Sequence, residues 1–356
     1  MSQPELNTAL LFRVDASAQM GMGHLMRCLA LAQAMRLAYP DLTMYFAMRA
    51  SSVPYAQSRE DWLGELIILP EPLVLVDEPL WLAQICAQHS IGMIILDGYQ
   101  FDQAYRQQLH PLPCMKVLFD DNNNSGFLFA DAVINGASNA AQLGYQTSAP
   151  GAVLCVGEAY RILRQEFAAD SARLPWAQRQ ALTIVMGGSD PLNLSLKIIQ
   201  ALEQAAFTDQ IILVTGAAYQ HLASLQQFIQ HSELRVNHRH NCQHVAEVFS
   251  QSRLVVSAAG GSQFELAACF CPTLLLVVAD NQRNATAQAI TQGWCQSLDM
   301  LQGTDADLIV DKLITLWASQ DALEHMHEAA KQHGDWQGTA RLVRQLALRY
   351  QEYCGE

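Results

Sequence analysis

Short apolar runs of strand length alternate with helical patterns along the whole chain. In the first half the expected strands are Leu10–Val14, Thr43–Ala47, Leu66–Leu69, Met93–Leu96, Lys116–Phe119 and Ala132–Ile134. In the second half they are Leu182–Met186, Ile211–Thr215, Leu254–Ala258 and Pro272–Val278. Amphipathic stretches such as Leu80–His89 and Asp102–Leu109 lie between them. This alternation predicts βαβ units, and therefore an α/β fold with parallel sheets and right-handed crossovers.

A chain of 356 residues suits two domains better than one core. The stretch Gly136–Pro150 is rich in Ala, Ser, Asn and Gly, and a polar stretch follows at Ala168–Gln180. We place the boundary in this region and expect a first domain over residues 1–158 and a second over 159–356. The amphipathic C-terminal stretch Trp336–Tyr353 is expected to be a packing helix, which can return to the first domain.

Charge and composition exclude several classes of partner. The net charge is −13 and the chain has no basic block, which disfavours a nucleic-acid partner. No apolar run is long enough to span a bilayer, and the N-terminus lacks the basic region of an export signal, so we expect a cytoplasmic protein with no membrane partner. Nine scattered cysteines without a CxxC pair indicate reduced, mostly buried thiols. The oligomeric state is left open.

The stretch Arg13–Cys28 reads RVDASAQMGMGHLMRC and is the centre of the first half. An expected strand ends there, a loop carries Gly21 and Gly23, and His24 opens a helix. The positions after it form an apolar helical stripe, namely Leu25, Cys28, Leu29, Ala32 and Met35. A strand, a glycine turn and a helix N-terminus together make an anion-binding device.

The position of His24 has a chemical consequence. The positive pole of the helix disfavours the imidazolium, which leaves a neutral ring able to accept a proton near pH 7. Gly-x-Gly-His lacks the third glycine of a dinucleotide fingerprint, so the motif alone is also compatible with a tight turn and a surface histidine.

A second group of polar residues follows the fourth expected strand, where Asp97-Gly98-Tyr99 lies. Ligands bind beyond the carboxyl ends of strands in open parallel sheets. Arg13, Asp15, His24 and Tyr99 are all expected at that edge; a turn with a half-buried tyrosine is the alternative. The next acidic pair, Asp120-Asp121, could be a functional carboxylate pair, but we favour a solvated turn.

Two expected strands of the second half run directly into glycine pairs. The first turn is Met186–Asp190 and the second is Ala259–Ser262, and each precedes a helical pattern. The second helix carries Glu265. Strand, glycine turn and helix N-terminus again favour a phosphate, although either turn alone could be a plain tight turn.

The histidine-rich stretch Asn237–His244 has spacing that suggests a metal, but no carboxylate lies close, and it joins a short strand to a helix. We therefore predict no metal site. His325 and His327 are two positions apart in a helical pattern and are expected at the surface.

Six ordered blocks resemble a known family. They are Phe12–Ala32, Ile95–Tyr99, Tyr160–Phe167, Met186–Ile198, Ser257–Ala267 and Asn281-Gln282. In these blocks the chain is similar to the UDP-2,4-diacetamido-2,4,6-trideoxy-β-L-altropyranose hydrolases, the UDP-sugar hydrolases of pseudaminic acid biosynthesis. The resemblance implies two Rossmann-like domains in a GT-B architecture with an interdomain cleft. It also implies water as the acceptor, cleavage of the anomeric C–O bond with inversion, and no cofactor or required metal.

The resemblance also implies roles for residues in the matching blocks. His24 would be the base that activates water, and Tyr99 would line the sugar pocket and orient the water or the leaving group. Glu265 would bind the ribose hydroxyls. The residues expected to hold or support the substrate are Arg13, Asp15, Gly21, Gly23, Gly188, Ser189, Asn193, Gly261, Ser262, Asn281 and Gln282. Within that set, Arg13 and Asp15 are expected to hold the loop in place, and Asn193 to support the first glycine turn.

Three other interpretations remain. A GT-B glycosyltransferase would share the UDP site and require an acceptor. A non-catalytic nucleotide-sugar-binding protein would bind UDP without turnover, but the histidine in the loop would then be unexplained. A Rossmann dehydrogenase lacks its third glycine and the acidic residue after the second strand. The second glycine turn, which reads Ala-Ala-Gly-Gly-Ser at residues 258–262, also departs from a simple family pattern at its first glycine, and this leaves open which backbone amides contact phosphate.

Overall fold

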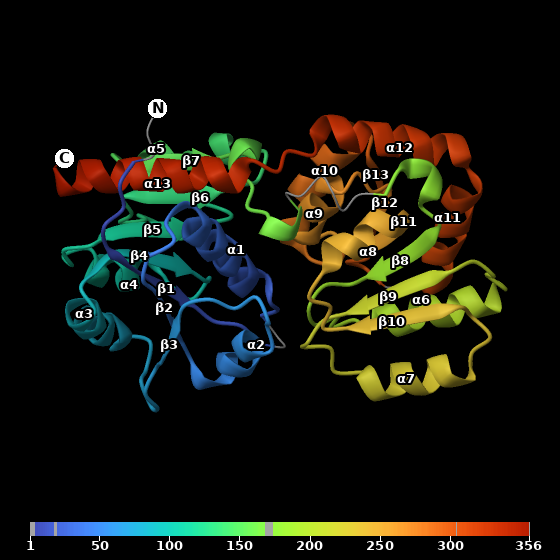
Figure 1. Cartoon of the computed structure of the whole chain (residues 1–356), viewed down its shortest axis with the longest axis horizontal. Helices are drawn as coiled ribbons and strands as arrows, with labels where there is room; N and C mark the ends of the chain where they lie inside the picture. The colour runs from blue at the N-terminus through green and yellow to red at the C-terminus, as the bar shows by residue number, and fades with distance from the viewer. Residues whose placement is uncertain (1–3, 18–19, 168–173, 304, 356) are drawn as a thin grey trace. The chain divides into compact units, whose positions relative to one another are not determined.

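The computed structural model describes residues 4–17, 20–167, 174–303 and 305–355 of the chain (Figure 1). The chain forms two compact units. The first comprises Met1–Ala16, His24–Gln165 and Trp336–Glu356, and the second comprises Ser17–Gly23 and Glu166–Asp335. Residues 168–173, in the polar stretch near the expected domain boundary, lie outside the described residues.

The first unit contains a seven-stranded parallel sheet. Its strands are β1 (Ala9–Val14), β2 (Met44–Met48), β3 (Glu65–Ile68), β4 (Ile91–Asp97), β5 (Met115–Phe119), β6 (Ala132–Asn135) and β7 (Val153–Val156). They lie in the order β3-β2-β1-β4-β5-β6-β7, and every pairing is parallel. Six of the strands are those expected from the sequence, and β7 was not expected. It is a four-residue edge strand, which leaves little pattern to detect.

Helices cover both faces of this sheet. Those of the first unit are α1 (Gly23–Ala38), α2 (Val53–Gln57), α3 (Glu78–Gln88), α4 (Gln103–Leu109), α5 (Tyr145–Ser148) and α13 (Gly338–Cys354). The predicted apolar stripe of α1 is buried at every position. On another face, Leu82 of α3 and Leu109 of α4 pack in one core with Leu11, Ile94 and Leu118 of the sheet.

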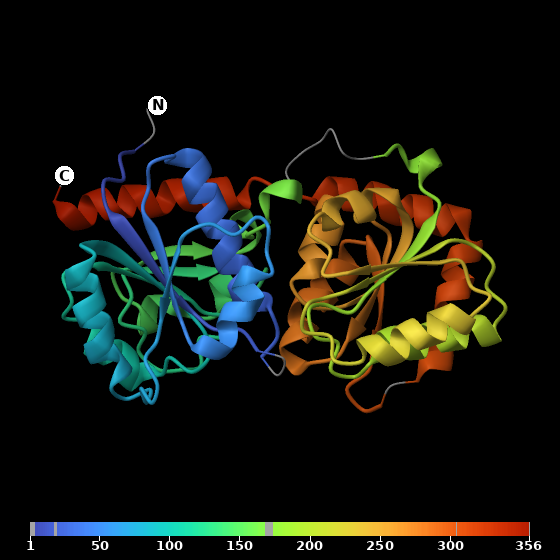
Figure 2. The same cartoon turned by 60° about the horizontal axis from the view of Figure 1, so that its bottom comes forward.

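The C-terminal helix α13 belongs to the first unit, where it lies beside β7 (Figure 1, Figure 2). Thr339 in its first turn accepts the N–H of Leu163 at 2.9 Å and donates to the carbonyl of the same residue at 3.1 Å. A Cβ added to Gly338 would lie 2.2 Å from the carbonyl oxygen of Arg161. Only glycine therefore lets the helix approach this segment so closely.

The second unit contains a six-stranded parallel sheet. Its strands are β8 (Ala181–Val185), β9 (Ile211–Thr215), β10 (Val236–His240), β11 (Ser252–Ala258), β12 (Thr273–Val277) and β13 (Cys295–Asp299). Their order is β10-β9-β8-β11-β12-β13. The two strands at the edges, β10 and β13, were not among the expected strands. They are rich in polar residues because an edge strand is partly exposed, so the apolar signal is weak.

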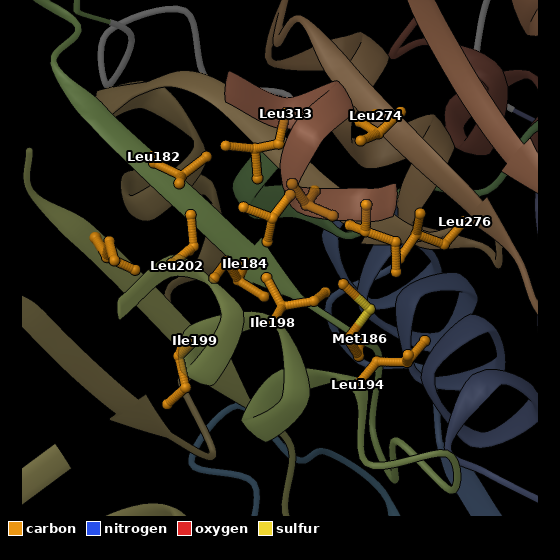
Figure 3. Close-up of a cluster of buried hydrophobic side chains, with 14 of the residues drawn as sticks. Leu182, Ile184, Met186, Leu194, Ile198, Ile199, Leu202, Leu274, Leu276 and Leu313 are labelled. Atoms are coloured by element: carbon orange, nitrogen blue, oxygen red, sulfur yellow. The ribbon is translucent and has the colours of Figure 1, made fainter. Parts of the chain in front are cut away.

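The helices of the second unit enclose its sheet. They are α6 (Leu194–Gln204), α7 (Leu222–His231), α8 (Val245–Gln251), α9 (Ser262–Ala268), α10 (Arg283–Thr291), α11 (Ala306–Ala318) and α12 (Gln320–His333). Figure 3 shows the core in which Leu182 and Ile184 of β8 meet Ile198 of α6 and Leu313 of α11. Fully buried aliphatic side chains of this kind each contribute about 1.5–3 kcal/mol.

Both sheets reverse their strand order at one position. In the first sheet this topological switch point lies between β1 and β4, and in the second it lies between β8 and β11. Doubly wound sheets bind ligands at the carboxyl ends of strands flanking this point. The predicted fold class, two Rossmann-like domains with parallel sheets, is confirmed.

Candidate functional site

A histidine–aspartate pair lies at the switch point of the first sheet. His24 is in the first turn of α1, which follows β1, and Asp97 is the last residue of β4. The Nδ1 atom of His24 lies 2.6 Å from Oδ1 of Asp97, and both side chains are buried. An ionised carboxylate can only accept in this bond, so Nδ1 is assigned the donor role, and in the neutral form of the ring Nε2 would be the acceptor atom.

Arg27 joins this pair to a second carboxylate. Its Nε and Nη2 atoms both donate to Asp97 at 2.6 Å, and its Nη1 atom donates to Asp121 at 2.7 Å. The hydroxyl of Tyr99 donates to Asp121 at 2.8 Å. The Tyr99 and His24 rings are nearly perpendicular, with centroids 4.9 Å apart. Five side chains thus form one connected polar network.

The interpretation of Asp121 as part of a solvated turn is wrong. Its carboxylate binds Arg27 and Tyr99 because β5, which it follows, lies next to β4 in the sheet. The strand order that makes β5 a neighbour of β4 comes from the tertiary fold, and the sequence pattern does not show that Arg27 reaches across. The sequence pattern gives no signal for the role of Arg27.

Charges within the network stabilise its ionised forms. Burial alone would raise the pKa of Asp97, but Arg27 and His24 outweigh burial and lower it. Asp121 shows the same balance: burial opposes ionisation, and the Arg27 guanidinium lowers its pKa. For the neighbouring Cys28, burial and then Asp97 raise the pKa, so this residue remains a thiol whose Sγ–H faces Asp97.

Arg13, near the end of β1, and Asp15, just after that strand, bind each other. Arg13 is fully buried, with Nη1 2.7 Å from Asp15 and Nε 2.5 Å from Glu78. Asp15 also accepts the backbone N–H of Arg49 and the hydroxyl of Ser52. These contacts tie Arg13 and Asp15 to other elements of the first unit, and that the pair holds the loop in place stays a prediction. A direct contact of Arg13 with substrate would require the surrounding side chains to move.

The loop between β1 and α1 carries the two predicted glycines. Gly21 donates its N–H to the carbonyl of Ser17 at 2.8 Å, and Gly23 is the first residue of α1. Residues 18 and 19 of this loop lie outside the described residues.

In the second unit, the first glycine turn follows β8. Gly187 has φ +78°, a conformation that glycine adopts without strain, and Gly188 and Ser189 follow it. The Asp190 carboxylate accepts the N–H groups of Leu194 and Ser195 at 2.9 and 2.8 Å. Asp190 therefore caps α6, and those two amides are already occupied by the protein.

The loop after β9 supports this turn from the side. A Cβ added to Gly216 would lie 2.4 Å from the carbonyl oxygen of Gly188, and that oxygen accepts the N–H of Ala218 at 3.1 Å. Asn193 accepts the hydroxyl of Tyr219 at 2.6 Å. Asn193 thus connects the start of α6 to this loop. The close approach at Gly216 was missed because its only signal is one glycine after a strand.

The second glycine turn follows β11, the strand next to β8. Gly261 precedes Ser262, the first residue of α9, and Glu265 lies in the first turn of that helix. Asn281 and Gln282 follow β12, the next strand in the sheet. The predicted residues of the second half therefore converge on the carboxyl edge of one sheet.

His238 and His240, which were expected after a short strand, lie within β10. Both approach the hydroxyl of Thr215, at 2.8 and 3.1 Å. Burial lowers the pKa of each, and in His238 the neighbouring His240 adds to this. Within the described part of the chain, no group of three or more His, Cys, Asp or Glu side chains is arranged to hold a metal ion.

All nine cysteines are free thiols, and seven of them are buried, as predicted. Among the helices of the described residues, none is both long and apolar enough to cross a bilayer.

Comparison with known proteins finds distant relatives, and no family model matches the chain. Over 278 residues it is 24% identical to an uncharacterized protein from Methanocaldococcus jannaschii, and this match covers 76% of this chain and 55% of that protein. The chain therefore spans about half the length of this relative. Over 257 residues it is 27% identical to the UDP-2,4-diacetamido-2,4,6-trideoxy-beta-L-altropyranose hydrolase of Campylobacter jejuni, covering 70% and 85%. Over 345 residues it is 21% identical to the spore coat polysaccharide biosynthesis protein SpsG of Bacillus subtilis, covering 95% and 97%.

Solved structures identify the fold. MurG from Acinetobacter baumannii superposes with a TM-score of 0.65 at 14% identity, covering 94% of this chain and 98% of that one. MnaA from S. aureus, solved with UDP, gives a TM-score of 0.69 at 12% identity, covering 98% and 97%. The chain therefore has the GT-B type of fold and is a distant relative of a UDP-sugar hydrolase.

Proposed function

We propose that this protein hydrolyses a UDP-sugar at its anomeric carbon, with inversion. The oxygen of water bonds to C1 while the bond from C1 to the diphosphate oxygen breaks. One proton of that water passes to His24, the other stays on the new hydroxyl, and UDP leaves with the bonding electrons. The observation that carries the proposal is the buried His24–Asp97 pair at the switch point of the first sheet.

The base is the Nε2 atom of His24. The bond from Nδ1 to Asp97 fixes the tautomer and the ring orientation, and the carboxylate stabilises the imidazolium that forms. Asp97 itself remains ionised because Arg27 lowers its pKa despite its burial. Tyr99, whose ring contacts His24, would orient the attacking water or the sugar.

The leaving group would bind at the second unit. A diphosphate is a stable anion, so the protein need only hold its charge, and backbone N–H groups of the two glycine turns suit this task. We assign this role to Gly188, Ser189, Gly261 and Ser262. The carboxylate of Glu265 would accept the ribose hydroxyls. Asn281 and Gln282 would contact the sugar or the phosphate from the next strand end. No cofactor or metal is needed for this chemistry.

The proposed substrate is UDP-2,4-diacetamido-2,4,6-trideoxy-β-L-altropyranose, in the synthesis of pseudaminic acid for surface glycans such as those on flagellin. Support comes from the six sequence blocks and from the named activity of the Campylobacter jejuni relative. We place the reaction in the cytoplasm, without nucleic-acid or membrane partners.

The test is UDP release from this UDP-sugar in the absence of any acceptor, followed by phosphorus and proton NMR. We expect wild-type protein to release UDP and free sugar, with the inverted anomer formed first. The His24→Asn variant should bind UDP but release none, and the matched variant His325→Asn, exposed on α12, should behave as wild type. If His24→Asn retains most of its turnover, the assignment of the base is wrong.

The same assay separates the alternatives. The GT-B type of fold is also compatible with a glycosyltransferase. Such an enzyme would release UDP only after an acceptor is added. A non-catalytic binding protein would bind UDP and release none from the sugar under either condition.

A further inference from the structure

The second unit contains a hollow of about 420 Å³ that the proposed reaction does not use. Its lining residues lie at the amino-terminal ends of strands, because Arg179 precedes β8, Asp209 precedes β9, Arg235 precedes β10 and Arg253 is at the start of β11. The glycine turns lie at the carboxyl ends of these strands. The hollow is therefore on the opposite edge of the sheet, separated from the nucleotide site by the length of β8, about 16 Å.

Three arginines and a single acid, Asp209, line this hollow. Arg179, Arg235 and Arg253 have no carboxylate within 4.0 Å among the described residues. The acid in the lining, Asp209, instead accepts the indole N–H of Trp317 at 2.8 Å. In a chain with net charge −13, this is a local concentration of positive charge.

Arg179 is the buried arginine of this hollow and is held by backbone carbonyls. Its side chain lies in the protein, with 3% of the residue exposed. Nε donates to the carbonyl of Leu174 at 3.2 Å, and Nη1 donates to that of Cys269 at 3.0 Å. Carbonyls fix the guanidinium without neutralising it, and Nη2 has no acceptor among the described residues. A buried cation held only by neutral groups is stabilised when an anion pairs with it.

Two tryptophans make rigid walls for the hollow. Trp176 stacks on His327 with centroids 4.8 Å apart, and Trp317 lies under the guanidinium of Arg253 at 4.7 Å. The prediction that His327 is at the surface is wrong, because its Nδ1 atom lies 2.7 Å from the carbonyl of Phe270 and only 4% of the residue is exposed. Two of the three charges, on Arg179 and Arg253, are therefore held by contacts within the protein, while Arg235 is exposed.

We propose that this hollow is a second ligand site, which takes a small metabolite with two or more oxyanion groups. Guanidinium forks match the geometry of both phosphate and carboxylate oxygens. The volume lies within the range of ordinary small-molecule sites. The inference is independent of the proposed hydrolysis, since none of the hollow's residues belongs to the His24 network or to the glycine turns.

The experiment is calorimetric titration of the whole protein with pyrophosphate and, separately, with citrate. UDP is kept saturating so that the nucleotide site is occupied. We expect one further binding event per chain, which weakens as salt is added. Tighter binding of pyrophosphate would identify a phosphate metabolite as the ligand, and tighter binding of citrate a carboxylate metabolite.

The test variant is Arg235→Gln, because Arg235 is exposed and its loss leaves no buried group unpaired. Loss of one charge-assisted contact should weaken probe binding about tenfold or more. The matched control is Arg239→Gln, which removes an exposed arginine of β10 that does not line the hollow, and it should bind as wild type. The proposal is overturned if wild-type protein binds neither probe in the presence of UDP. Equal weakening in both variants, or no weakening in Arg235→Gln, would also overturn it.

Discussion

Replacement of Asp97 by asparagine probes the site most sharply, because the amide keeps the size of the carboxylate and loses its charge. In the structure three N–H groups donate to Asp97, one from His24 and two from Arg27, each at 2.6 Å. An asparagine offers one acceptor oxygen, so its NH2 group would face one of these donors. His24 would then lose the partner that fixes its tautomer.

The size of the effect follows from these contacts. Removing one partner of a buried charge pair costs about 3–5 kcal/mol. Arg27 keeps its bond to Asp121 at 2.7 Å, so we expect about 3 kcal/mol, near the lower end. A domain stable by about 5–15 kcal/mol remains folded after this loss. For a catalytic His–Asp pair, the same exchange lowers kcat by roughly 10⁴.

Two assays measure the two effects. Urea unfolding gives the loss of stability, and UDP release from the UDP-sugar gives kcat and KM at a temperature where the variant is folded. We expect kcat to fall while KM is retained, since Asp97 is buried and does not reach substrate. The matched control is Asp41→Asn at an exposed position, which should change neither quantity. A variant less stable but with kcat within tenfold of wild type would refute the role of Asp97 in orienting His24.

Three further predictions concern the supports of the two sites. The pKa values of Asp97 and Asp121 are lowered in the folded protein, so their contribution to stability should be complete above the unfolded pKa of about 3.9 and should be lost as the pH falls below that value. Urea unfolding from pH 7 to pH 3 should show this loss of stability, and equal stability at every pH would contradict it. Glu78→Gln should cost about 3–5 kcal/mol in the same assay, since the buried carboxylate holds Arg13, and a cost below about 1 kcal/mol would show that the pair is not structural. Gly216→Ala should weaken UDP binding in calorimetry, because the added Cβ would meet the backbone of the first glycine turn; unchanged affinity would show that this turn does not hold UDP.

The central parts of the fold could be predicted from the sequence because their physical signal is local. Strands such as β1, β4 and β8 are buried on both faces and are continuous apolar runs. The strands that escaped detection, β7, β10 and β13, are short or rich in polar residues at or near the sheet edges. Their formation depends on pairing with a neighbour, which a local pattern does not contain.

The site could be predicted only in part for a related reason. His24 and Tyr99 were found because each follows an expected strand, and the structure brings them into contact. The partners that give His24 its chemistry depend on which strands are neighbours and on which side chains reach across. Asp97 was noted at a strand end beside Tyr99 but was given no role, and the links through Arg27 and Asp121 arise from tertiary packing.

The central claim is that water attacks the sugar carbon and not the phosphorus. The direct measurement is turnover of the UDP-sugar in water enriched in oxygen-18, without acceptor, with mass spectrometry of both products. The account predicts one heavy oxygen in the released sugar and none in UDP. Heavy oxygen in the UDP phosphate would mean that the P–O bond breaks, and would contradict the proposed role of His24 at the anomeric carbon.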